Sequence, residues 1–148
     1  MKVIETKQFL DTLCQLASEG KTVSTIVSGG SMSPFLANNR DTVFMEQIIK
    51  PPKKGDIVLF QRDNNDYVLH RIRKVSKKGY FLIGDRQYST EGPVSSEQLR
   101  LNVISAKRKN KIITPKSLLW QFYSKIWLNM IFLRPAIFRI HGFFSKKS

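Results

Sequence analysis

The first two thirds of the chain alternate between short apolar runs and stretches that favour turns. Glycine, proline, asparagine and aspartate gather between the runs, as in the segment KPPKKGD before residue 57. The connections are too short to hold the helices that link parallel strands. The pattern therefore predicts a mainly β fold, with a compact antiparallel β domain over about residues 21–108. Its predicted strands are 22–27, 42–48, 56–62, 67–75, 79–84 and 99–108.

The two ends of the chain carry helical patterns instead. Residues 1–20 place apolar side chains on one helical face, and Gly20 is expected to end that helix. Helical spacing returns near the C-terminus, where Pro135 is expected to kink or restart the helix. The chain thus divides into an N-terminal amphipathic helix (1–20), the β domain (21–108) and a basic, aromatic helical segment (109–148). The N-terminal face holds Phe9, Leu10, Leu13, Leu16 and Ala17, and the C-terminal row holds Leu119, Phe122, Ile126, Met130 and Leu133.

Positive charge is concentrated in the C-terminal segment. The formal net charge is +14, and residues 107–148 contain ten Lys and Arg but no Asp or Glu. Trp120, Trp127 and several Phe lie among these cations, a composition typical of a helix lying on an anionic membrane. The alternatives are helices that cover the β domain, or a membrane span, which is disfavoured because the uncharged stretches are shorter than about 20 residues. Nucleic acid is not expected as a partner, because the aromatic residues continue an apolar face.

Cysteine and histidine are too scarce for disulfide or metal chemistry. Cys14 is the single cysteine and lies in a helical pattern, so we expect a buried apolar side chain. His70 and His141 do not form a metal-ligand cluster, and we expect neither a metal nor another cofactor. Charged residues interrupt the first 21 positions, which therefore lack the apolar core of an export signal. These features predict a membrane-associated protein on the cytoplasmic face.

The sequence SGGSMSP, residues 28–34, places two glycines directly before Ser31. This composition suits an exposed, sharply held hydroxyl, although an ordinary turn uses the same residue types. A serine hydroxyl is a weak nucleophile without a base to take its proton. His70 lies in a predicted strand on the same face as Val68 and Ile72, which directs it into the domain. There a neutral imidazole can act as a general base, or can be a structural histidine only.

Four segments in order resemble the sequence boxes of the type I signal peptidase family. They are SGGSMSPFL, KKGDIVLFQR, YVLHRIRKV and YFLIGDRQYSTEGPV. The resemblance covers about residues 26–94, and it implies a signal-peptidase-like β domain with serine endopeptidase activity. The family carries an N-terminal transmembrane anchor, whereas this chain begins with an amphipathic pattern, so we expect membrane association through its C-terminal segment.

The resemblance also implies a role for each candidate residue. Ser31 takes the position of the nucleophile, and His70 takes that of the general base, as in the endoplasmic-reticulum type of the family. An acidic residue orients the histidine in those enzymes, and either Asp85 or Glu91 matches such a position. The candidate oxyanion and substrate-binding residues are Ser28, Gly29, Gly30 and Met32.

The expected function is cleavage of a leader or pro-peptide in a peptide or preprotein substrate near a membrane surface. The resemblance implies a preference for small side chains before the cleaved bond. One alternative is a non-catalytic basic module that binds anionic lipid or nucleic acid. Another is a self-cleaving, repressor-like peptidase, although this chain lacks the lysine base and the DNA-binding module of those proteins.

Overall fold

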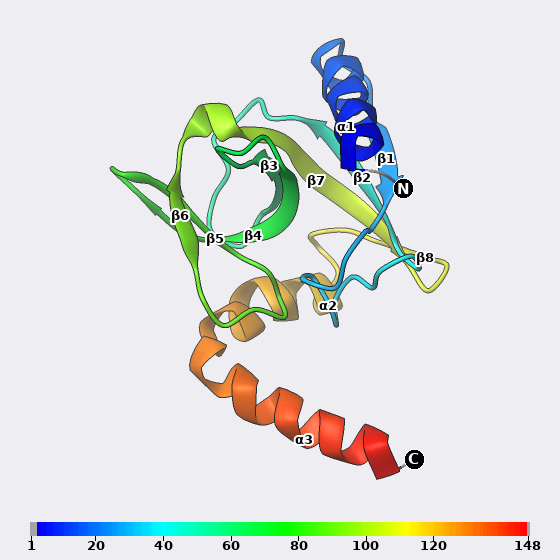
Figure 1. Ribbon diagram of the computed structural model, residues 1–148, viewed down its shortest axis with the longest axis vertical. Helices are drawn as coiled ribbons and strands as arrows, with labels where there is room; N and C mark the ends of the chain where they lie inside the picture. The colour runs from blue at the N-terminus through cyan, green and yellow to red at the C-terminus, as the bar shows by residue number, and fades with distance from the viewer. Residues whose placement is uncertain (1–2, 148) are drawn as a thin grey trace.

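The computed structural model describes residues 3–147, which fold around one antiparallel sheet (Figure 1). Helix α1 packs at one end of the sheet, and the C-terminal helical elements pack at the other (Figure 1). The mainly β prediction is therefore confirmed. The strands are β1 (Val23–Ile26), β2 (Thr42–Gln47), β3 (Ile57–Gln61), β4 (Tyr67–Ser76), β5 (Gly79–Ile83), β6 (Glu91–Val94), β7 (Leu99–Arg108) and β8 (Lys111–Ile113).

The strand order is β1-β2-β7-β3-β4-β5-β6, and β8 pairs with β7. Neighbouring strands are antiparallel, as the short connections predict. Six of the strands match predicted runs to within two residues at each end. The exceptions are β6 and β8, which are short and begin in turn-like or basic sequence.

The sheet separates two groups of buried side chains. Strand β3 is the clearest case, because Ile57 and Leu59 enter the main core while Val58 and Phe60 enter a second, smaller core. All four side chains are buried, which explains why this strand reads as a continuous apolar run. The second core also holds Ile72, Leu82, Val94 and Leu99.

Helix α1 (Val3–Ser18) closes one end of the main core with Leu13, Cys14 and Ala17. The chain then turns at Gly20, whose φ of 88° favours glycine. The predicted helix, its end and the burial of Cys14 are thus confirmed. Phe9 differs from the prediction, because it is 45% exposed rather than on the buried face.

The C-terminal segment is broken into short pieces rather than one helix. It runs through α2 (Leu118–Gln121), a π-helical turn η2 (Phe122–Ile126), the 3₁₀ turns η3 (Trp127–Asn129) and η4 (Ile131–Leu133), and α3 (Arg134–Lys147). The expected restart at Pro135 is confirmed, because α3 begins one residue earlier. No helix within residues 3–147 is both long and apolar enough to cross a membrane.

Three aromatic side chains of this segment, Trp120, Tyr123 and Trp127, belong to the main core. These three side chains therefore cover the β domain, as one of the alternatives predicted from the sequence has it. The apolar row predicted from the sequence is divided, because Leu119 packs against the main core while Phe122 is 38% exposed and Ile126 is 53% exposed. Figure 1 shows α3 extending away from the sheet beyond them.

Candidate active site

Ser31 begins a tight turn that follows β1. The Ser31 side chain is half-buried, and its carbonyl oxygen accepts a hydrogen bond of 2.9 Å from the Arg86 backbone N–H. Within residues 3–147 the Ser31 backbone N–H has no hydrogen-bond partner. An unpaired N–H beside a hydroxyl is the arrangement that an oxyanion acceptor requires.

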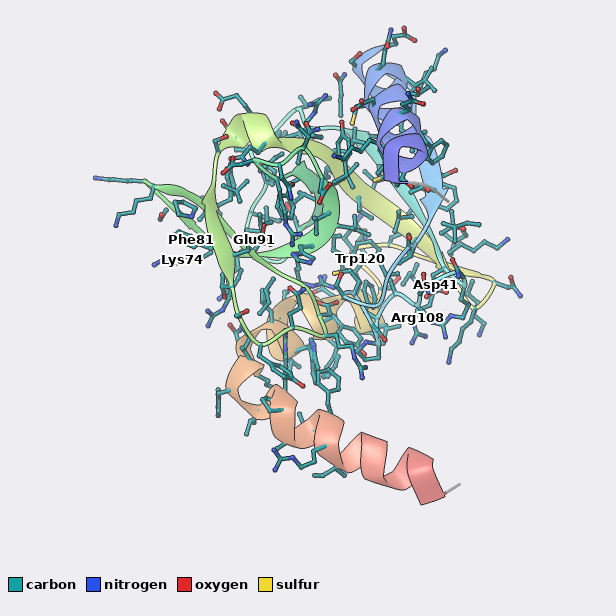
Figure 2. The ribbon with its side chains drawn as sticks, in the orientation of Figure 1. Asp41, Lys74, Phe81, Glu91, Arg108 and Trp120 are labelled. Atoms are coloured by element: carbon teal, nitrogen blue, oxygen red, sulfur yellow. The ribbon has the colours of Figure 1, made fainter. Side chains whose placement is uncertain are left out.

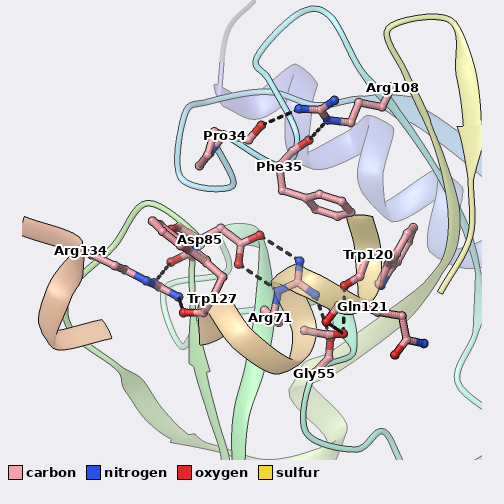
Figure 3. Close-up of polar contacts among 12 residues, drawn as sticks. Pro34, Phe35, Gly55, Arg71, Asp85, Arg108, Trp120, Gln121, Trp127 and Arg134 are labelled. Carbon is pink, nitrogen blue, oxygen red and sulfur yellow. Dashed lines mark hydrogen bonds and ion pairs between the residues drawn. The ribbon is translucent and has the colours of Figure 1, made fainter. Parts of the chain in front are cut away.

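Two side chains from elsewhere in the fold fasten the turn. Arg108 of β7 donates to the carbonyl oxygens of Phe35 at 2.8 Å and Pro34 at 3.4 Å (Figure 3). The buried Asp41, labelled in Figure 2, accepts from the Ala37 backbone N–H at 2.8 Å. Burial raises the pKa of Asp41, but hydrogen bonds from the Arg40 side chain and two backbone N–H groups outweigh it and lower that pKa overall.

The Gly84 backbone packs closely against Ser31. A Cβ atom at Gly84 would lie 2.5 Å from the Ser31 carbonyl oxygen and 3.1 Å from the Ser31 Cβ. Such distances are too short for any side chain, so glycine is required here by packing. The Gly-Asp sequence after β5 thus brings this loop against the Ser31 turn.

His70 lies in β4, opposite Val58 of β3, and it is 1% exposed. Its neighbour Arg71 pairs with Ile83, the last residue of β5. Continuing that antiparallel register by one position places His70 beside Gly84. Ser31 thus contacts Gly84, and an extended β4–β5 register would bring His70, which is far away in the sequence, to the same glycine.

Burial keeps the His70 imidazole neutral. Burial lowers the pKa of His70 to about 4, the Glu91 carboxylate raises it, and the Arg62 guanidinium lowers it. Its Nδ1 atom is buried and has no hydrogen-bond partner within the described part of the chain. The neutral imidazole has a ring nitrogen that can accept the serine proton, although a pKa of about 4 makes it a weaker base than a solvated histidine, and Nδ1 is unpaired.

Asp85 is committed to a different partner. Both of its carboxylate oxygens accept hydrogen bonds of 2.9 Å from Arg71, and both side chains are fully buried (Figure 3). Arg71 also donates to the Gly55 carbonyl oxygen at 3.0 Å and lies over the Phe35 ring. Asp85 therefore joins the Gly-Asp loop to β4 through Arg71, and no hydrogen bond of the described residues links it to His70.

Glu91 lies at the start of β6, and its partner differs from that of Asp85. It forms an ion pair with Arg62, at 2.8 and 2.9 Å for its two oxygens. Two neighbouring surface depressions share this pair, one reaching Phe60 and the other reaching Arg86. The Glu91 carboxylate raises the pKa of His70. Arg62 binds both of its oxygens, just as Arg71 binds both oxygens of Asp85, so both carboxylates stay candidates for the orienting residue.

The remaining candidates divide into exposed and buried residues. Ser28 is exposed, and Gly29 has a φ of 87° and donates its N–H to Asn38 at 2.8 Å. A Cβ atom at Gly30 would contact nothing within 4 Å, so packing does not require glycine there. Met32 is buried in the main core, which is the structural role that the sequence also allows.

Sequence reasoning missed several arginines around this site. Strand alternation assigned Arg71 to the face opposite His70 without a partner, but the structure pairs it with Asp85 in the core. Arg134, which is fully buried, was counted only as part of a basic segment. Its position directly before Pro135, in a segment without acids, was the available signal. Among the side chains that the structure describes, those of residues 6–140, no three His, Cys, Asp or Glu lie close enough together to hold a metal ion.

The comparisons with known proteins point in the same direction as the sequence boxes. The chain is 34% identical to signal peptidase I W of Bacillus subtilis over 88 residues, which cover 55% of this chain and 45% of the relative. The chain therefore spans less than half the length of that protein. No family model and no solved structure matches the chain. The similarity indicates a signal peptidase I-like relationship and, at the level of the family, a peptidase-like function.

Proposed function

We propose that the protein is a serine endopeptidase that cleaves a leader or pro-peptide near a membrane surface. One observation carries the proposal. In a chain that is similar to a signal peptidase, Ser31 packs against Gly84, and His70 lies in β4, whose pairing with β5 ends at Ile83, directly before Gly84. The half-buried hydroxyl, the neutral imidazole and the unpaired Ser31 N–H supply the three groups that acyl transfer needs.

In the proposed reaction the Ser31 hydroxyl oxygen bonds to the carbonyl carbon of the substrate while its proton passes to His70. The Ser31 N–H donates to the oxyanion that develops. Collapse of this intermediate breaks the peptide C–N bond, and His70 gives the proton to the leaving amine. Water then hydrolyses the acyl-enzyme, again with His70 as base. A carboxylate, either Glu91 or Asp85, orients the imidazole through Nδ1.

Peptide cleavage tests this function. The full chain is incubated with leader peptides that carry small residues before the expected cleavage bond, and the products are identified by mass spectrometry. We expect Ser31→Ala and His70→Ala each to reduce kcat by about 1,000-fold or more, because members of such a unit fail together. The control is Ser33→Ala, which removes another hydroxyl of the same turn. If Ser31→Ala retains the cleavage, Ser31 is not the nucleophile and the proposed function is wrong. The alternative of a non-catalytic basic module would then stand.

The proposed membrane contact is the outer side of the α2–η2 segment. Leu118, Phe122 and Ile126 recur every fourth residue, and Leu118 is 89% exposed. Lys125 is also exposed, and residues 107–148 contain no acid to repel an anionic surface. Apolar side chains flanked by cations suit peripheral docking on anionic lipid, without a membrane span.

A further inference from the structure

The C-terminal segment holds the loop that contacts Ser31. Arg134, the first residue of α3, donates to the carbonyl oxygens of Gly84 at 3.0 Å and Gln87 at 2.8 Å. The Trp127 indole N–H donates to the Asp85 carbonyl oxygen at 2.7 Å. Three of the four carbonyl oxygens of residues 84–87 therefore accept hydrogen bonds from Trp127 and Arg134. Both donors lie more than forty positions further along the chain.

The same loop contacts the Ser31 turn from its other side. The Arg86 N–H donates to the Ser31 carbonyl oxygen, and Gly84 leaves no space for a side chain against Ser31. Residues 84–87 therefore lie between Ser31 and Arg134. A shift of this loop would displace Ser31 relative to β4, which carries His70.

Arg134 is well held in this position. Its side chain is fully buried, it donates to the Trp127 carbonyl oxygen at 3.2 Å, and its guanidinium stacks 5.1 Å from the centre of the Trp127 ring. Phe138, one turn further along α3, packs against Trp127 and lies under Arg86. A planar guanidinium with several donors can bridge two carbonyl oxygens and a ring, which a lysine ammonium cannot.

We infer that Arg134 and Trp127 are positioning residues for the Ser31 site, and that the C-terminal segment is a working part of the catalytic domain. The inference rests on the proposed peptidase function. It goes further, because it assigns a role in the reaction to residues outside the four boxes that resemble the signal peptidase family. Arg134 acts through the loop at Gly84 and does not touch the substrate.

The test compares Arg134→Gln, Arg134→Lys and Trp127→Phe with Arg139→Gln, which replaces an exposed arginine of the same helix. We expect kcat for a soluble peptide to fall about 10- to 100-fold in Arg134→Gln while KM stays within about twofold. Arg134→Lys should recover only part of the rate, Trp127→Phe should show a smaller loss, and Arg139→Gln should retain the full rate.

A second readout needs no catalysis. Hydrogen exchange of the Arg86 amide, which donates to Ser31, should become at least about tenfold faster in Arg134→Gln and Trp127→Phe. The Ile72 amide, which donates to Asp56 elsewhere in the domain, should keep its rate. Trp127→Phe keeps an aromatic side chain in the core and removes only the indole N–H donor and part of the ring, so this variant provides the test if Arg134→Gln does not fold.

The outcomes separate the two claims. If Ser31→Ala abolishes cleavage but the Arg134 and Trp127 variants keep the parent kcat and Arg86 exchange rate, the positioning inference is overturned and the peptidase function stands. A lower unfolding temperature with an unchanged kcat would also overturn it, because that result describes structural support only. If Ser31→Ala leaves cleavage intact, the proposed function fails, and the Arg86 exchange still decides whether the segment holds the loop.

Discussion

His70 is the residue at which burial has the largest chemical consequence. An imidazole in the second core, among Val58 and Phe60, loses the hydration that stabilises its charged form, and its pKa falls to about 4. The histidine is therefore neutral at pH 7. The ion pair between Arg62 and Glu91 sets the remaining field around it.

This burial predicts that stability falls as the pH is lowered. The unfolded histidine binds a proton below its ordinary pKa of 6.5, whereas the folded one resists protonation until about pH 4. The unfolded state thus binds more protons in that window, and folding stability is lost as the pH falls through it. We expect the free energy of unfolding to drop by about 2 kcal/mol between about pH 7 and about pH 5.

Urea unfolding of the parent protein and of His70→Gln at both pH values measures this difference. Glutamine does not titrate, so the variant should lack the part of the pH dependence that His70 contributes. Equal pH dependence in the two proteins would show that the imidazole is not desolvated as described.

At the scale of the elements, the loop after β5 and the turn after β1 depend on each other. Gly84→Ala would force a Cβ atom against the Ser31 carbonyl oxygen, so we expect the loop to move and the rate of peptide cleavage to fall about 100-fold. Gly30→Ala is the matched comparison in the neighbouring turn, because its added Cβ meets nothing within the protein.

The two alanine variants should therefore differ in stability. Thermal unfolding of Gly30→Ala should match that of the parent within a few degrees, whereas Gly84→Ala should unfold several degrees lower. Peptide cleavage by Gly30→Ala then reports whether a substrate backbone passes over this glycine. A Gly84→Ala protein with the parent stability and rate would contradict the close approach described for this loop.

Local patterns predicted the elements better than their partners. Alternation and turn residues located six strands, and helical spacing located α1 and the restart at Arg134. They could not show that both faces of β4 are covered, so Arg71 was assigned no partner. Spacing also did not show which side of the C-terminal segment packs on the domain, and the helical pattern is interrupted by the π-helical turn η2.

The candidate site shows the same limit. The types of residue and their order indicated Ser31 and His70, but pairing between distant segments decides which partner each carboxylate takes. Arg71 binds Asp85 in the core, and Arg62 binds Glu91 of β6. These facts depend on tertiary packing, which local sequence patterns do not encode.

At the scale of the whole molecule, the C-terminal segment has two sides with different roles. Its inner side supplies Trp120, Tyr123 and Trp127 to the main core, so removing residues 109–148 would expose that core rather than remove an appendage. Its outer side carries the proposed lipid contact. Surface substitutions are therefore the appropriate test of membrane binding.

We expect the full chain to bind vesicles that contain phosphatidylglycerol and to bind pure phosphatidylcholine vesicles much more weakly. The double variant Leu118→Ser, Ile126→Ser should bind about tenfold more weakly, because each leucine or isoleucine contributes apolar area. Ile49→Ser is the control, since Ile49 is 82% exposed but lies between β2 and β3. Sedimentation with vesicles measures all three proteins.

If Ile49→Ser weakens vesicle binding as much as the double variant does, the contact is not specific to the C-terminal segment. Equal binding to neutral and anionic vesicles would instead contradict the role of its positive charge.

The central claim is that Ser31 and His70 react as a pair, and a serine-directed fluorophosphonate probe tests it most directly. The full chain is treated with the probe, and mass spectrometry locates the modified residue. The account predicts a single label on Ser31, lost in Ser31→Ala, slowed strongly in His70→Ala, and unchanged in Ser33→Ala. Absence of a label on Ser31, or a labelling rate that does not depend on His70, would contradict it.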